Sequence, residues 1–80
     1  MDDKELLDRI AELVKGEHEL ETRHGADGLS EEEQARLAAT EVALDQCWDL
    51  LRQRRARRAS GQDPEGAHVR SERIVEGYQQ

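Results

Sequence analysis

The sequence has little material for a globular core. Its 80 residues include no phenylalanine, one tryptophan, one tyrosine and one proline, and hydrophobic residues make up 35% of the chain. A chain of this length forms one small domain, and so few large apolar side chains exclude a thick core. No run approaches the roughly 18 to 20 apolar residues needed to cross a bilayer, so we expect no membrane segment. The 39% of charged residues and the periodic leucines favour long amphipathic helices.

Cysteine is as scarce as the aromatic residues. Cys47 stands alone, which excludes an intrachain disulfide and the usual zinc patterns. It also has no acid–base partner at a suitable spacing, so we interpret it as a small packing residue. The acidic start, Asp2 to Glu5, has the wrong charge for a secretory signal. We therefore expect a cytoplasmic protein.

No combination of residues indicates an enzyme. The sequence offers no nucleophile–base pair, no glycine-rich phosphate loop and no complete set of metal ligands. We therefore predict no catalytic residues, no cofactor and no metal.

Two helices are predicted, over about residues 3–23 and 31–59, with a turn over about 24–30. Gly25 is a natural stop for the first helix, and Ser30 and Glu33 have the spacing of a capping box at the start of the second. No proline or glycine then occurs before Gly61. Residues 1–59 are thus interpreted as one helical unit. Residues 60–80 are interpreted as a C-terminal arm, in which Asp63 and the following proline predict a short turn.

Apolar residues form a seam in each predicted helix, with alternating spacings of four and three. The first seam is Leu6, Ile10, Leu13, Glu17 and Leu20, and the second is Leu37, Glu41, Leu44, Trp48, Leu51 and Arg55. Folding at the turn pairs them in five layers: Leu20–Leu37, Glu17–Glu41, Leu13–Leu44, Ile10–Trp48 and Leu6–Leu51. This predicts an all-α, coiled-coil-like antiparallel two-helix hairpin. Its expected core or interface anchors are Trp48, Leu44, Leu51, Ile10 and Leu13.

The apolar stripe is wider than one partner helix requires, because Leu7, Val14, Val42 and Leu50 flank the seam. A lone two-helix hairpin also has little core, and small chains of this kind usually associate. We therefore predict a homodimer that forms a four-helix bundle. The alternative is that the arm covers the extra stripe within its own chain.

Glu17 and Glu41 are predicted to share a layer, as a buried polar pair that fixes the register of the helices. A carboxylate metal site in a bundle core is the alternative interpretation, but the ligand set is incomplete.

Five arginines form a possible anion-binding patch: Arg52, Arg54, Arg55, Arg57 and Arg58. In the predicted hairpin this patch lies beside Asp2, Asp3, Glu5 and Asp8. Residues 1–33 carry a net charge of −8 and residues 34–59 a net charge of +3. The favoured interpretation is therefore charge matching within the chain, and binding of nucleic acid or a nucleotide phosphate is the alternative.

Three stretches carry a resemblance to a known family: LDQCWDLLRQRRARR (Leu44 to Arg58), LVKGEHEL (Leu13 to Leu20) and VEGY (Val75 to Tyr78). In these stretches the chain resembles a family of short actinobacterial proteins of unknown function. The resemblance implies a small cytoplasmic helical protein and carries over no site residues. Together with the residue patterns, it leads us to expect a non-enzymatic interaction module with an unidentified protein partner.

Overall fold

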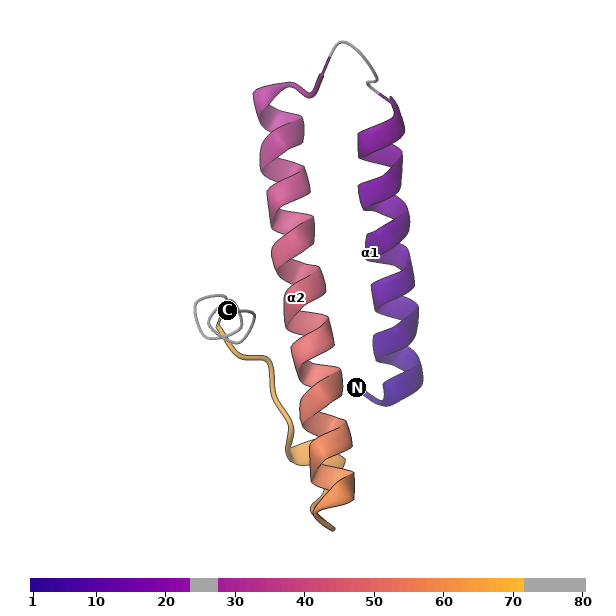
Figure 1. The fold of residues 1–80 in the computed structure, drawn as a ribbon, viewed down its shortest axis with the longest axis vertical. Helices are drawn as coiled ribbons and strands as arrows, with labels where there is room; N and C mark the ends of the chain where they lie inside the picture. Colours follow the sequence, from indigo (N-terminus) through magenta and orange to yellow (C-terminus); the bar gives the residue numbers. More distant parts are fainter. Residues whose placement is uncertain (24–27, 72–80) are drawn as a thin grey trace.

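The computed structural model describes residues 1–23 and 28–71. It contains α1 (Asp3–Arg23), α2 (Glu31–Ala59) and a short 3-10 helix, η2 (Pro64–Gly66). α1 and α2 lie side by side and run in opposite directions (Figure 1). The described stretches hold no strand, which confirms the predicted all-α class, and their helices are too polar to cross a membrane. Gly25 lies outside the described residues.

α1 begins with a capping box. The Asp2 carboxylate accepts a hydrogen bond from the backbone N–H of Glu5 at 2.8 Å. The Glu5 carboxylate in turn accepts one from the backbone N–H of Asp2 at 3.3 Å. These bonds satisfy backbone donors that the first turn of a helix leaves unpaired. The box was not predicted, although the spacing of an acid three residues before a glutamate would have indicated it.

α2 begins with the capping box that its sequence predicts. The Ser30 hydroxyl accepts from the backbone N–H of Glu33 at 3.1 Å, and the Glu33 carboxylate accepts from the backbone N–H of Ser30 at 2.9 Å. Ser30 has an extended backbone, with φ −66° and ψ 166°, as a residue that precedes a helix requires. The reciprocal bonds fix the first residue of a 29-residue helix.

α2 ends in a Schellman motif around Gly61. Gly61 has a φ of +76°, a left-handed conformation that costs glycine little. The backbone N–H of Gln62 donates to the Arg57 carbonyl at 2.7 Å, and that of Gly61 donates to the Arg58 carbonyl at 3.1 Å. The chain therefore reverses at Gly61 and returns along α2.

One line of apolar side chains joins the two long helices. The buried members are Leu6, Ile10, Leu20, Leu44 and Leu51. Leu6 and Leu51 pack in the same cluster, as the predicted Leu6–Leu51 layer requires. Leu13 is half-buried. Burial of a leucine contributes about 1.5 to 3 kcal/mol, so these few contacts hold the helices together.

α2 is rotated about its axis relative to the predicted seam. It presents Thr40, Cys47 and Arg54 toward α1 where the prediction had Glu41, Trp48 and Arg55. Thr40 lies beside Leu20, Cys47 packs on the Leu6 and Leu51 cluster, and Arg54 bonds to Asp3. Glu41, Trp48 and Arg55 are exposed.

Two predicted layers are therefore wrong. The Ile10–Trp48 layer fails because Trp48 lies on the outer flank of the helix pair, where 42% of it is exposed. The Glu17–Glu41 layer fails because Glu41 is exposed and Glu17 is partly exposed, so the two carboxylates form no buried pair. The register of the helices therefore does not depend on a buried pair of these glutamates.

The residues on the opposite flank of α2 explain the rotation. Leu44 and Leu51 can face α1 in both the predicted and the observed rotation of α2. The residues on either side of them therefore determine which rotation is more stable. In the observed orientation Leu50 is also buried, and Ala67 from the arm packs against its cluster. Arg54 gains two carboxylate partners, described below. The wide apolar stripe is thus partly covered within the chain, by the segment after Gly61.

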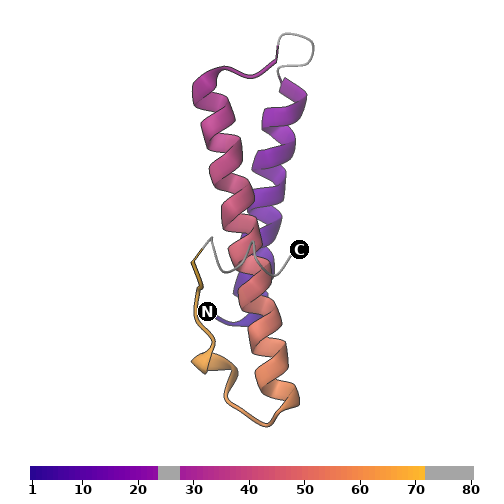
Figure 2. The ribbon, with the colours of Figure 1, turned by 60° about the vertical axis from the view of Figure 1, so that its left-hand side comes forward.

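The arm follows one side of α2 (Figure 2). It starts with η2, where the Asp63 carboxylate accepts from the backbone N–H of Glu65 at 2.9 Å, and this confirms the predicted short turn. Further along, the Gln53 amide donates to the His68 carbonyl at 2.7 Å. The arm therefore docks on its own chain up to about residue 70, and the apolar residues Ile74, Val75 and Tyr78 lie outside the described residues.

Candidate functional site

The arginines at the end of α2 do not form one open basic surface. Arg54 is buried, and its Nε donates to Asp3 Oδ1 at 2.6 Å while a terminal nitrogen donates to Glu65 Oε1 at 3.1 Å. Arg58 donates to both Asp3 oxygens, at 3.1 and 2.5 Å. Hydrogen bonds from Arg58 and then Arg54 lower the pKa of Asp3 to about 2. These two arginines are thus engaged by acids of their own chain.

The other three arginines of the predicted anion patch point to different surroundings. Arg57 is half-buried, and its guanidinium packs so closely on Gly66 that a Cβ atom at that position would collide with it. Arg52 approaches the Asp49 carboxylate to 4.0 Å, and Arg55 is exposed. A nucleic-acid surface requires several free cations side by side, and this arrangement gives that alternative little support.

Asp49 is fully buried, with 0% of the residue exposed. Arg70 from the arm donates two hydrogen bonds to its carboxylate, from Nε at 2.9 Å and from Nη2 at 2.5 Å. The Gln53 amide donates to the same carboxylate at 3.0 Å, and the Gln46 amide donates to the Arg70 carbonyl at 3.3 Å. The hydrogen bonds from Arg70 hold the pKa of Asp49 below its ordinary value.

The Asp49–Arg70 pair was not predicted from the sequence. Its local signal is that Gln46, Asp49 and Gln53 recur at spacings of three and four, on one side of α2. Nothing in that spacing identifies Arg70, which lies 21 residues further along the chain. The pair fastens the arm to α2, and the two guanidinium nitrogens favour the charged form of the Asp49 carboxyl.

The other candidate reactive groups are the Cys47 thiol, the acids and histidines that could hold a metal, and His18. Burial raises the pKa of the Cys47 thiol, which makes it a weaker nucleophile at neutral pH. Among the residues that the structure describes, no three histidines, cysteines or acids come close enough to hold a metal ion. His18 is exposed on α1.

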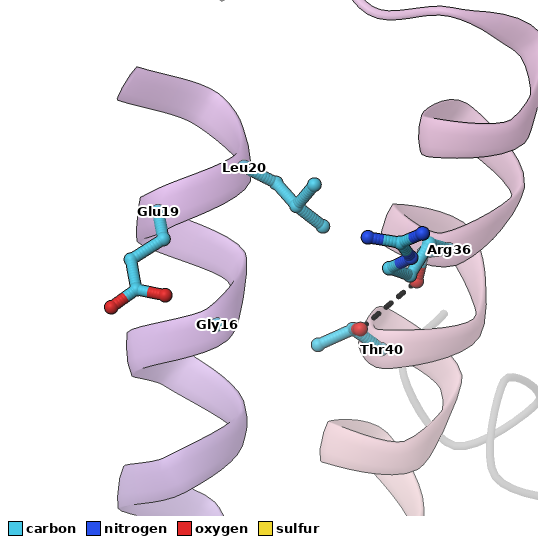
Figure 3. A pocket seen from close by; sticks show the side chains of 5 residues that line it. All are labelled: Gly16, Glu19, Leu20, Arg36 and Thr40. Carbon is cyan, nitrogen blue, oxygen red and sulfur yellow. Dashed lines mark hydrogen bonds between the residues drawn. The ribbon is translucent and has the colours of Figure 1, made fainter. Parts of the chain in front are cut away.

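Two shallow hollows occur on the side of the hairpin where the arm lies. One, of about 200 Å³, is lined by Gly16, Glu19, Leu20, Arg36 and Thr40. In Figure 3, Leu20 from α1 and Arg36 from α2 point toward each other across it. The Thr40 hydroxyl is occupied by a bond to the Arg36 carbonyl at 2.9 Å, and the Arg36 guanidinium lies 3.9 Å from Glu32. The polar groups that α2 contributes to this hollow are thus engaged within their own helix.

The second hollow, of about 290 Å³, lies between the first part of α1, the middle of α2 and the arm. Its lining includes Leu6 and Arg9 from α1, Gln46 and Leu50 from α2, and Val69 from the arm. Arg9 and Gln46 therefore mark the side of each helix that faces the arm.

An exposed apolar surface occupies the opposite side of the hairpin. Leu7 and Val14 each follow a seam residue of α1, and Trp48 follows Cys47 on α2. In an antiparallel pair these positions lie on one side, away from the arm. Leu7, Val14 and Trp48 are 45%, 46% and 42% exposed.

Two charged residues complete this surface. Glu41 and Arg55 lie seven residues to either side of Trp48 and therefore share its side of α2. We call the five residues Leu7, Val14, Glu41, Trp48 and Arg55 the Trp48 face. Of the five expected anchors, Ile10, Leu44 and Leu51 are buried and Leu13 is half-buried, which leaves Trp48 as the anchor available to a partner.

Comparisons with known proteins give a family without an assigned activity. The family model described as "Protein of unknown function (DUF2630)" matches residues 2–80. The uncharacterized proteins Mb0922c of Mycobacterium bovis and Rv0898c of Mycobacterium tuberculosis are each 54% identical to the chain over 79 residues. Each alignment covers 95% of this chain and 88% of the relative. No solved structure matches.

Proposed function

Because this chain belongs to DUF2630, a family of unknown function, we propose its function from its geometry: it is a non-enzymatic module that binds a protein partner, either a different protein or a second copy of itself, through the Trp48 face. One observation carries the proposal. The single tryptophan of the chain is 42% exposed, on the side of the hairpin that also carries the exposed Leu7 and Val14. Tryptophan is enriched among the few residues that contribute most of the binding energy at protein interfaces.

The state of the other conspicuous side chains supports this choice of surface. The buried acid and the buried arginine of the described chain, Asp49 and Arg54, are bound by groups of the same chain. The acids at the start of each long helix cap backbone N–H groups. Folding thus accounts for these groups, whereas it does not account for three exposed apolar side chains, Leu7, Val14 and Trp48, on one side of the hairpin. A concentration of exposed apolar side chains on one side of a small protein is typical of an interaction site.

The chemistry of the remaining groups supports a non-enzymatic role. The raised pKa of Cys47 and the ion pair that occupies Asp49 disfavour these residues as nucleophile and general base. The proposed activity therefore depends on surface contact alone.

Site-specific photo-crosslinking tests the proposal. Benzoylphenylalanine would replace Val14, on the Trp48 face, or Glu12, an exposed residue on the far side of α1. The full chain would be irradiated in a mycobacterial host, chosen because the relatives are mycobacterial. We expect position 14 to form a defined adduct with a protein, whether another protein or a second copy, and position 12 to form none. Failure to crosslink at position 14, or equal crosslinking at both positions, would contradict the proposal.

A further inference from the structure

We propose that the Trp48 face binds a second copy of this chain, around a two-fold axis that passes beside Trp48 and brings Glu41 of each copy against Arg55 of the other. This inference rests on the proposed function and names its partner. In the resulting dimer α2 lies antiparallel on α2 of the partner, and α1 lies antiparallel on α1 of the partner.

The charges on α2 are arranged symmetrically about Trp48. Glu41 precedes it by seven residues and Arg55 follows it by seven, which is about 10 Å along the helix in each direction. Both side chains are exposed, and neither forms an ion pair within the described part of the chain. A two-fold rotation beside Trp48 exchanges the two positions. It therefore creates two Glu41–Arg55 contacts and places the two tryptophans together at the centre.

The apolar residues on α1 obey the same symmetry. Leu7 and Val14 are also seven residues apart, and their midpoint falls between Ile10 and Ala11. Because Leu6 packs with Leu51, Trp48 lies level with about Arg9 on the antiparallel helix. The axis beside Trp48 thus passes about 2 to 3 Å from the midpoint of Leu7 and Val14. The rotation brings Leu7 of each copy against Val14 of the other.

Charge also selects the antiparallel arrangement over the parallel one. If the two α2 helices ran in the same direction, Glu41 would face Glu41 and Arg55 would face Arg55, and both contacts would be repulsive. Two further charged residues agree with the antiparallel order, since Asp45 lies before Trp48 and Arg52 lies after it. The face is thus complementary to itself, as an isologous interface requires.

A second copy also suits the size of the chain. Six apolar residues form the buried core of the described part, and small domains with so little core usually associate. The arm already covers Leu50 on the other side of α2. The Trp48 face is therefore the side left for a partner, and pairing there would give the four-helix bundle a second apolar layer.

Charge exchange across the interface tests the inference. Glu41→Arg and Arg55→Glu each turn both predicted ion pairs into like-charge contacts. By sedimentation equilibrium we expect the unmodified full chain to dimerise and each single variant to dimerise about tenfold more weakly. An equimolar mixture of the two variants should form a heterodimer as stable as the unmodified dimer. Glu41 and Arg55 are 14 residues apart on one helix, about 21 Å, so this recovery cannot arise within one chain.

Two controls make the result specific. Glu12→Arg introduces the same charge change on the far side of α1 and should leave dimerisation unchanged. Circular dichroism should show that each variant keeps its helices, because no described residue pairs with Glu41 or Arg55 inside the chain. If either charge-reversal variant loses helicity, Glu41→Gln and Arg55→Gln would be measured in place of the two charge-reversal variants. Each should weaken the dimer by a smaller factor.

Two outcomes would overturn the inference. One is an unmodified chain that stays monomeric at millimolar concentration; if position 14 nevertheless crosslinks to another protein, the proposed function stands and only the second copy is excluded. The other is a dimer that both single variants leave unchanged, which would exclude the antiparallel Glu41–Arg55 contacts.

Discussion

At the scale of single residues, two acids hold the ends of this structure together. Asp3 binds Arg54 and Arg58 at the junction of α1 and α2, and Asp49 binds Arg70 of the arm. The sequence predicted the first pairing in outline, because an antiparallel hairpin brings the acidic start beside the basic end. It did not predict the second pairing. Arg70 reaches Asp49 only because of the path of the arm, and the sequence of the arm has no periodicity from which that path could be predicted.

Removal of Arg70 should destabilise the fold more than removal of any exposed arginine. Arg70→Ala leaves the fully buried Asp49 without its main partner, and we expect a loss of about 3 kcal/mol in the free energy of unfolding. Arg52→Ala is the matched control, since Arg52 lies 4.0 Å from the same carboxylate and is exposed; its loss should be below about 1 kcal/mol. Urea denaturation measures both, and equal losses would show that Arg70 does not fasten the arm.

The Asp3 carboxyl should make stability depend on pH in the acidic range. Its pKa is lowered from 3.8 to about 2 by Arg58 and Arg54, so folding favours the charged form. The stabilisation is therefore complete above pH 4 and disappears as the pH falls toward 2. Urea denaturation from pH 5 to pH 2 should show this decline, and Asp3→Asn should reduce its slope. An unchanged slope in the variant would contradict the assignment.

At the scale of elements, the sequence indicated helix ends better than helix orientation. Ser30, Glu33 and Gly61 act through local backbone geometry, which a sequence encodes directly. The rotation of α2 was mispredicted because Leu44 and Leu51 fit two seams equally well. The choice between Cys47 and Trp48 as their neighbour depends on the contact of Ala67 with the Leu50 cluster and on the ion pairs of Arg54 with Asp3 and Glu65. Ala67 and Glu65 belong to the arm, whose path the helix periodicity does not give.

The observed rotation predicts which large side chain matters for folding of the single chain. Leu51→Ala removes a side chain that is 1% exposed and should cost about 3 kcal/mol. Trp48→Ala, measured at a concentration low enough to avoid association, should cost less than about 1 kcal/mol. Thermal or urea denaturation of the dilute proteins compares them. A cost of 3 kcal/mol or more for Trp48→Ala would show that Trp48 packs between the two helices, as the sequence predicted, and would contradict the observed rotation.

Two glycines should respond to alanine with opposite signs. Gly61 has a φ of +76°, so Gly61→Ala should destabilise the end of α2 by about 1 kcal/mol. Gly16 lies within α1, and an added Cβ there would meet no atom within 4 Å. Gly16→Ala should therefore stabilise the protein by up to about 1 kcal/mol. Melting temperatures give both signs, and a loss of stability in Gly16→Ala would show that α1 needs the glycine.

At the scale of the whole molecule, the chain has two different sides. The arm covers one side of the hairpin through Ala67, His68 and Arg70, while the other side carries Leu7, Val14 and Trp48. The sequence predicted that the apolar stripe was too wide for two helices, and it left open whether the arm or a second chain covers the excess. In the structure the arm takes the flank of Leu50, and we propose that a second copy takes the flank of Trp48.

The fluorescence of Trp48 tests this account most directly, because it is the only tryptophan in the chain. Emission spectra would be recorded while the full-length protein is diluted from millimolar to nanomolar concentration. The account predicts short-wavelength emission at high concentration, where the partner buries the indole, and a shift to longer wavelength on dilution. Short-wavelength emission that persists in the monomer would place Trp48 in the core of the single chain and contradict the account.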